Sequence, residues 1–368
     1  MSIRRISQQH TVRLPVPSAA LFLVAAAIAS DAVPALSPSI HSVEWIGTVA
    51  LVAILFDGGS SIGLERFRSV ALPVAVLGTA GTFATAGLVA LFAHWALGLG
   101  WIMCGLLGAA IAPTDPAVMF SVLGHHSIGG RVQPLLEGES GANDPVGIAL
   151  MLGMIELATR THATFWIVVE TFALQMSIGL ALGIAGGLVE RQVLRRLASP
   201  TSGRHTILTL TLAGLVYAAA AVAHGSGFLA VFVAGLIVGP AFANGLSTLA
   251  EIAVFVALGL TISLGGVSAT HWVEGIALAA VTALVARPIA VAPLLAPTSL
   301  RRGEIAFVVW GGLKGAVPIL LAAFAVGRHV PDAHLLYDIV FVVVLTSVVV
   351  QGSSLSWMAR RLGVTPRA

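Results

Sequence analysis

Long apolar runs constrain this chain more than any other feature of its sequence. About twelve such runs lie between residues 14 and 356, each near the ~20 residues that a helix needs to cross a bilayer core of ~30 Å. Only 10% of the residues are charged and the mean hydropathy is +0.98, whereas a soluble domain carries about 25% charged residues. Because a lone strand cannot satisfy its backbone groups in lipid, each run is predicted to be a helix. The sequence therefore predicts an all-α polytopic membrane protein.

The positions of the basic residues support this arrangement. The predicted spans are 14–33, 42–62, 70–93, 99–122, 133–158, 164–189, 205–223, 227–243, 248–265, 272–296, 303–327 and 335–356. If both termini are cytoplasmic, the outer loops hold only Arg160 and Arg328, and nearly all other arginines lie inside. This is the positive-inside pattern, so we expect a multi-pass protein of the cell (inner) membrane. The pI of 9.7 therefore reflects topology, and no nucleic-acid partner is expected.

Several charged residues fall inside the predicted spans, where a charge costs at least ~2.5–3.5 kcal/mol. The bases are Arg287 and Lys314, and the acids are Asp57, Asp115, Glu139, Asp144 and, less deeply, Glu170 and Glu251. Ion pairs between helices are one explanation for them. Because the acids outnumber the bases, at least one acid must hold a proton or bind a cation.

The fourth span contains the sequence APTDP at 112–116. Two prolines remove amide donors and break the helix, and broken backbone at membrane depth is tolerated only where it faces protein or a watery cavity. The freed carbonyls, the Thr114 hydroxyl and the Asp115 carboxylate are oxygen ligands that suit an alkali cation. The alternative is a proline kink capped by Asp115.

The fifth span contains the sequence EGESGANDP at 137–145. Glu139 and Asn143 share a helix face, and Asp144 is one step round. Asp144 can therefore face a cavity, where a buried carboxylate can exchange a proton for a cation, while Glu139 meets a basic partner. The alternative is that Ser140 or Asp144 caps the start of the helix.

The eleventh span contains the sequence WGGLKGAVP at 310–318. Glycine and proline again interrupt a helix, here beside Lys314, and Arg287 offers a second buried cation. Paired interrupted helices in the two halves of a chain indicate a binding site between inverted repeats. Asp57, near the inner end of the second span, either lines the ion route or sits at the interface. The chain has no phosphate loop, nucleotide fingerprint or metal-type Cys/His spacing, so no cofactor is expected.

Three of these motifs, TDP at 114–116, ESGANDP at 139–145 and GLKGAVP at 312–318, resemble those of the monovalent cation:proton antiporters of the NhaP-type branch. The resemblance covers roughly 14–358. It implies an inverted-repeat Na⁺/H⁺ antiporter fold with two broken, crossing helices. It also implies a six-helix transport core, 70–158 plus 272–357, that moves against a dimerisation scaffold, 14–62 plus 164–265, in a homodimer.

The resemblance also assigns roles to residues. Asp144 would bind the proton or the Na⁺ or K⁺ (Li⁺ as a further candidate), with Thr114, Asp115 and Ser140 in or beside the ion site. Asp57 would contribute from the scaffold.

Glu139 would pair with Arg287 or Lys314. Asn143, in place of a second Asp, resembles the electroneutral members. The sequence departs from the family pattern in two places. Family members commonly have thirteen helices, and the first of these has no counterpart among the predicted spans. Lys314 stands where arginine is usual.

Two other interpretations of the sequence remain open at this point. Ser140 in GESG and His224 in AHGSG match the serine and histidine motifs of rhomboid-type intramembrane proteases, and Asp115 with Asp144 could form a two-aspartate protease. The chain could also be a channel or a transport-inactive membrane scaffold. Buried acids and bases, unexplained by a protease, favour the antiporter.

Overall fold

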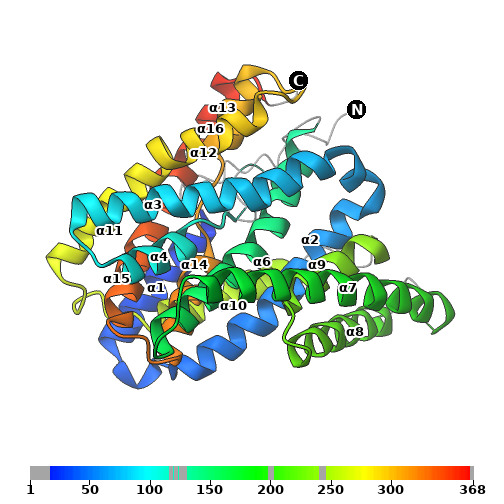
Figure 1. Cartoon of the computed structure of the whole chain (residues 1–368), viewed down its shortest axis with the longest axis horizontal. Coiled ribbons are helices and arrows are strands. Elements are labelled where there is room, and N and C mark those ends of the chain that lie inside the picture. The colour runs from blue at the N-terminus through cyan, green and yellow to red at the C-terminus, as the bar shows by residue number, and fades with distance from the viewer. Residues whose placement is uncertain are drawn as a thin grey trace, which may run out of the picture.

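The computed structural model describes residues 17–115, 119, 123, 131–197, 203–239 and 246–364. Every regular element in these ranges is a helix, as the apolar runs predict. The principal helices are α1 (Ser18–Ala32), α2 (Ile40–Val76), α3 (Thr82–Leu97), α4 (Trp101–Ile111), α6 (Val132–Thr159), α7 (Trp166–Leu197), α8 (Gly203–Val222), α9 (Gly227–Val238), α10 (Leu246–Gly259), α11 (Ala269–Val281), α12 (Arg287–Leu295), α13 (Arg302–Trp310), α14 (Ala316–Gly327), α15 (Ala333–Thr346) and α16 (Gly352–Arg361). Figure 1 shows them as one bundle, with α8 at one edge and α11 and α15 at the other.

The spans predicted at 42–62 and 70–93 are not separated by a loop. Helix α2 continues past residue 62 and, through a π-helical turn at Leu77–Gly81, runs into α3. The direction changes at Gly63, whose φ of 66° is a left-handed conformation that glycine adopts without a steric penalty. In Figure 1 the chain turns sharply between the labels α2 and α3.

Two helices are interrupted where the sequence predicts it. Helix α4 ends at Ile111, before Pro113, and the next four residues, 112–115, are not helical. Helices α13 and α14 are separated by the non-helical residues 311–315. The two interruptions touch, because the Asp115 amide donates to the Leu313 carbonyl at 2.9 Å.

Other boundaries differ modestly from the prediction. Helix α9 ends at Val238 rather than near 243, and α10 spans 246–259 rather than 248–265. The spans predicted at 272–296 and 335–356 each contain a π-helical turn, Thr282–Ala286 and Ser347–Gln351. Pro116 and most of 116–122, together with residues 14–16 and 240–243, lie outside the described residues.

The helices carry apolar side chains outward as well as inward. Within the described part, five helical segments are long and apolar enough to cross a membrane, and the remaining apolar helices are shorter. Trp95, Trp101 and Trp166, which lie near helix ends, are 77%, 56% and 70% exposed. A water-facing surface would not present so many large apolar groups, and tryptophan at helix ends is typical of the membrane–water interface.

Candidate functional site

The first interruption is held in place by side chains of α6. Thr114 is buried, and its hydroxyl accepts a hydrogen bond from Asn143 Nδ2 at 2.8 Å, while its amide lies 3.4 Å from Asn143 Oδ1. Asn143 therefore satisfies the Thr114 amide, which the broken helix leaves without a helical partner, and also the Thr114 hydroxyl. The neutral side-chain amide of Asn143, one residue before Asp144, thus stabilises the first interruption.

Asp144 lies on α6 at the level of both interruptions and is only 4% exposed. Ser140, one turn earlier, donates to Asp144 Oδ2 at 3.5 Å. The other oxygen, Oδ1, has no hydrogen-bond partner among the described residues. Asp115 and Lys314 are its charged neighbours and act on it electrostatically. An unsatisfied carboxylate oxygen at this depth is costly, and a bound proton or cation would remove that cost.

Lys314 connects the two interruptions. Its Nζ donates to the carbonyls of Ala112 and Pro113, both at 3.0 Å, and its amide donates to Ser347 Oγ at 3.0 Å. In an unbroken helix the Ala112 carbonyl would accept from residue 116, which is proline and has no amide hydrogen. The ammonium group therefore satisfies the Ala112 carbonyl, which loses its helical donor to a proline, together with the neighbouring Pro113 carbonyl.

Arg287, rather than Lys314, is the ion-pair partner of Glu139. Its Nη2 lies 2.8 Å from Glu139 Oε1, and both side chains are almost fully buried. Arg287 also donates to the carbonyls of Val309 and Val308 at 2.9 and 3.2 Å. These are among the last carbonyls of α13, so Arg287 both pairs with α6 and closes the end of the interrupted helix.

Gly315 permits the close approach of the two interruptions. An added Cβ at this position would overlap the Asp115 carboxylate. The chain can therefore bring Asp115 beside the start of α14 only because residue 315 has no side chain.

Of the remaining candidates, Asp57 lies apart from this cluster. It is half-buried on α2, and its charge acts on Glu137 near the start of α6 rather than on Asp144. Glu251, which the sequence analysis noted only as an intramembrane acid, interacts electrostatically with Asp115. Nothing in the sequence around Glu251 indicates which helix it faces, so this electrostatic interaction could not be predicted.

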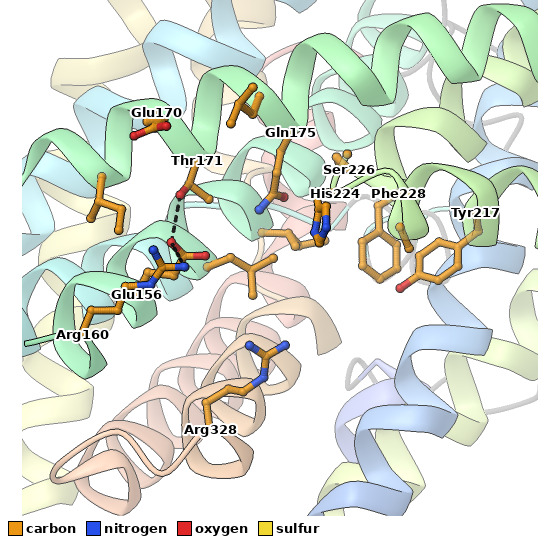
Figure 2. A pocket seen from close by; sticks show the side chains of 17 residues that line it. Glu156, Arg160, Glu170, Thr171, Gln175, Tyr217, His224, Ser226, Phe228 and Arg328 are labelled. Carbon is orange, nitrogen blue, oxygen red and sulfur yellow. Dashed lines mark hydrogen bonds and ion pairs between the residues drawn. The ribbon is translucent and has the colours of Figure 1, made fainter. Parts of the chain in front are cut away.

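A cavity of about 540 Å³ lies beside the second half of α6 (Figure 2). Its polar lining includes Glu156, Arg160, Glu170, Thr171, His224 and Arg328. Ile148 and Leu152 also line it, and on a helix they continue the face of Asp144 toward Glu156. The cavity thus lies on the line of Asp144, toward the end of α6, with two apolar side chains between.

Glu156 interacts with two other residues that line this cavity. Arg160 lies 3.4 Å from its carboxylate, and Thr171 of α7 donates to it at 3.2 Å. Figure 2 shows Arg328, from the end of α14, pointing toward the cavity from the side opposite the α7 residues. Charged groups of both signs therefore meet where α6, α7 and α14 come together.

The rhomboid-type protease alternative is not supported. The Ser140 hydroxyl bonds to Asp144. His224 lines the cavity, whose nearest α6 residue, Ile148, lies two turns or about 12 Å beyond Ser140.

Comparison with known proteins places these features in a family context. A family model described as "Sodium/hydrogen exchanger, transmembrane" matches residues 3–361. The chain is 38% identical to a protein named K(+)/H(+) antiporter NhaP from Alkalimonas amylolytica, over 86% of this chain and 57% of that protein. It is 32% identical to the K(+)/H(+) antiporter NhaP2 of Shewanella sp. (strain ANA-3), over 95% and 63%. It is 30% identical to the Na(+)/H(+) antiporter NhaP of Pseudomonas aeruginosa, over 87% and 81%.

The fold also has solved counterparts. The structure of the sodium proton antiporter MjNhaP1 from Methanocaldococcus jannaschii at pH 8 matches with a TM-score of 0.76 at 22% identity, over 94% of this chain and 92% of that one. An electron-microscopy map of the same antiporter matches with a TM-score of 0.78, over 97% and 94%. The chain spans about three fifths of the length of the first two sequence relatives.

Proposed function

Because the chain belongs to the sodium/hydrogen exchanger family, we propose that it exchanges a monovalent cation for protons across the cell membrane. The chain is a multi-pass membrane protein with the predicted antiporter fold. The observation that carries the proposal is Asp144, a buried carboxylate with an unsatisfied oxygen where two interrupted helices meet. K⁺ is the first cation to test, since two of the relatives compared are named K(+)/H(+) antiporters, and Na⁺ and Li⁺ follow.

The proposed mechanism is competition at one carboxylate. A proton or a dehydrated cation binds Asp144, and the cation also has the Asp115 carboxylate and the hydroxyls of Thr114 and Ser140 within the same cluster. Oxygen donors of this kind suit alkali cations. With Asp144 bare, the site would carry a charge through the membrane, which is costly. Only the loaded forms therefore cross, and the two fluxes are coupled.

The moving unit in this proposal is the core, 70–158 plus 272–357, and the scaffold is 14–62 plus 164–265. The hydrogen bonds described above around Asp144, Lys314 and Arg287 all join residues of the core ranges. Such a unit can move as one body without breaking them. We further propose a homodimer assembled through the scaffold, with both termini on the cytoplasmic side, and electroneutral exchange.

A pH-gradient measurement in everted membrane vesicles tests the function. A gradient, acid inside, is established, and K⁺, Na⁺ or Li⁺ is added in turn to vesicles with wild-type protein or Asp144→Asn. We expect cation-dependent, saturable collapse of the gradient with wild-type protein and none with Asp144→Asn, at equal protein in the membrane. Asn143→Asp is not a suitable control because it adds a charge; Glu65→Gln, an exposed acid, is.

The outcomes separate the candidates. Retained exchange in Asp144→Asn would refute the assignment of Asp144. Absence of exchange with every cation in wild-type vesicles would refute antiport and favour a transport-inactive scaffold, and non-saturable flux without proton movement would favour a channel.

A further inference from the structure

The second interruption separates a donor and an acceptor that an unbroken helix would join. In a continuous α-helix the Trp310 carbonyl would accept from the amide four residues later, which is that of Lys314. Here residues 311–315 are not helical, and the Lys314 amide donates instead to Ser347 Oγ at 3.0 Å. The Trp310 carbonyl accepts from Gln351 Nε2 at 3.1 Å. Both ends of the missing helical bond are therefore satisfied by side chains of another segment.

These two side chains are also joined to each other. Ser347 Oγ donates to Gln351 Oε1 at 2.6 Å, and both residues are buried. Because a carbonyl can only accept, the Gln351 side chain must turn its NH₂ group toward Trp310 and its oxygen toward Ser347. The Ser347 hydroxyl then gives its hydrogen to Gln351 and keeps a lone pair for the Lys314 amide. One continuous relay of hydrogen bonds thus runs from the Lys314 amide through Ser347 and Gln351 to the Trp310 carbonyl.

A π-helical turn between α15 and α16 supplies both side chains of the relay. Ser347 and Gln351 are the first and last residues of this turn, and the Gly352 amide donates to the Ser347 carbonyl five residues earlier. Single π-helical turns are rare and are frequent at functional sites. Ser354 accepts from Trp310 Nε1 at 3.0 Å and donates to the Gln351 carbonyl at 2.7 Å. Trp310, at the end of α13, is therefore fixed to the segment beside it by its backbone and by its side chain (Figure 1).

The stretch that the relay spans carries the bonds to the first interruption. The Leu313 carbonyl accepts from the Asp115 amide at 2.9 Å, and Lys314 Nζ donates to two carbonyls of the first interruption, both at 3.0 Å. If Trp310 and Lys314 were joined directly, the chain would continue as a helix, and the Leu313 carbonyl would face the amide of Val317 instead of Asp115. The relay therefore keeps the second interruption open in the form that contacts the first.

We propose that Ser347 and Gln351 are positioning residues for cation exchange, which hold the second interruption open so that Leu313 and Lys314 fix the ion site beside Asp144. The inference rests on the proposed function, and the two residues act through Leu313 and Lys314 rather than on the cation. Polar side chains at membrane depth are costly and by default indicate function. Without the relay, the backbone that carries the oxygen donors of the site loses its fixed position. The consequence is weaker cation binding, and it is the same whichever residue of the relay is removed.

The test measures the half-saturating concentration of K⁺ or Na⁺ and the maximal exchange rate in everted vesicles. Ser347→Ala and Gln351→Met each remove one link of the relay. We expect each to raise the half-saturating concentration about tenfold, the equivalent of ~1.4 kcal/mol, which is typical of a lost buried hydrogen bond. Because the relay is one chain of bonds, the double variant should show the same rise as either single variant rather than the product of the two.

Two further variants serve as matched controls. Ser347→Thr keeps the hydroxyl and should restore a half-saturating concentration near that of wild type. Ser353→Ala removes a neighbouring hydroxyl that donates to the Val350 carbonyl, outside the relay, and should match wild type.

Three results would overturn the proposal. They are a wild-type half-saturating concentration in Ser347→Ala, a lower maximal rate at an unchanged half-saturating concentration, and a double variant whose rise is the product of the single rises. If Gln351→Met does not accumulate in the membrane, Ser347→Ala, which deletes one oxygen atom, decides together with Ser347→Thr. Exchange that is lost in Asp144→Asn but unaltered in Ser347→Ala would refute only the positioning role. Absence of exchange in wild type would refute both proposals.

Discussion

The stability of the folded protein should depend more on the side chain of Arg287 than on the charge of its partner, Glu139. Arg287 donates to Glu139 Oε1 and to the carbonyls of Val309 and Val308. Arg287→Met removes all three bonds and leaves a carboxylate buried without its cation, which should lower the free energy of unfolding by about 3–5 kcal/mol. Glu139→Gln leaves a buried guanidinium without its anion, but it keeps an oxygen acceptor and the two carbonyls still accept from Arg287. It should therefore cost less, about 1–3 kcal/mol.

The double variant isolates the interaction between the two side chains. Because Glu139→Gln with Arg287→Met leaves no buried charge, its loss of stability should be smaller than the sum of the single losses by roughly 0.5–3 kcal/mol. Unfolding by SDS in mixed micelles, followed by circular dichroism, measures each value. Arg301→Met is the matched control: Arg301 is 76% exposed in its pair with Glu304, and its loss should cost under about 1 kcal/mol.

The reasoning fails on either of two results. Equal losses for Arg287→Met and Glu139→Gln would mean that the carbonyls of α13 do not depend on Arg287. Additive losses in the double variant would mean that the two charges do not stabilise each other in the folded protein.

Three further predictions concern the site and the cavity. Gly315→Ala should abolish exchange while leaving protein in the membrane, because the added Cβ overlaps the carboxylate of Asp115, whereas Gly214→Ala, with open space around it, should be near wild type. Leu152→Cys should react with a membrane-impermeant maleimide in right-side-out vesicles, since it lines the cavity, and wild type, whose one cysteine is buried, should not. In the vesicle assay, Asn143→Ala should raise the half-saturating cation concentration about tenfold. This factor corresponds to ~1.4 kcal/mol for the loss of its two hydrogen bonds to Thr114.

The sequence predicted the two helix interruptions because their causes are local. Proline removes an amide hydrogen and glycine relaxes the backbone wherever they occur, so the breaks at Pro113 and at residues 311–315 could be read from single residues. The prediction that the spans 42–62 and 70–93 are separate helices was wrong for a related reason. One glycine, Gly63, turns the chain without a loop.

Contacts between helices could be predicted only as sets of candidates. Arg287 and Lys314 were equal partners for Glu139 in the sequence, since both are buried bases. The structure separates them because α12 places Arg287 against α6, while Lys314 donates to the carbonyls of Ala112 and Pro113 at the first interruption. Glu251 was noted in the sequence only as an intramembrane acid, because the neighbours of a helix face are set by tertiary packing.

In the proposed mechanism, the charges at the site also set the stoichiometry. Glu139 and Arg287 neutralise each other. If Lys314 is protonated, as its two carbonyl acceptors favour, it offsets one of the two acids Asp115 and Asp144, and the empty site then carries about one net negative charge. One proton or one monovalent cation brings that charge to zero, and a net charge is costly to move through the bilayer. Because both loaded forms are neutral and the empty form is not, the same balance accounts for the coupling and for one-to-one exchange.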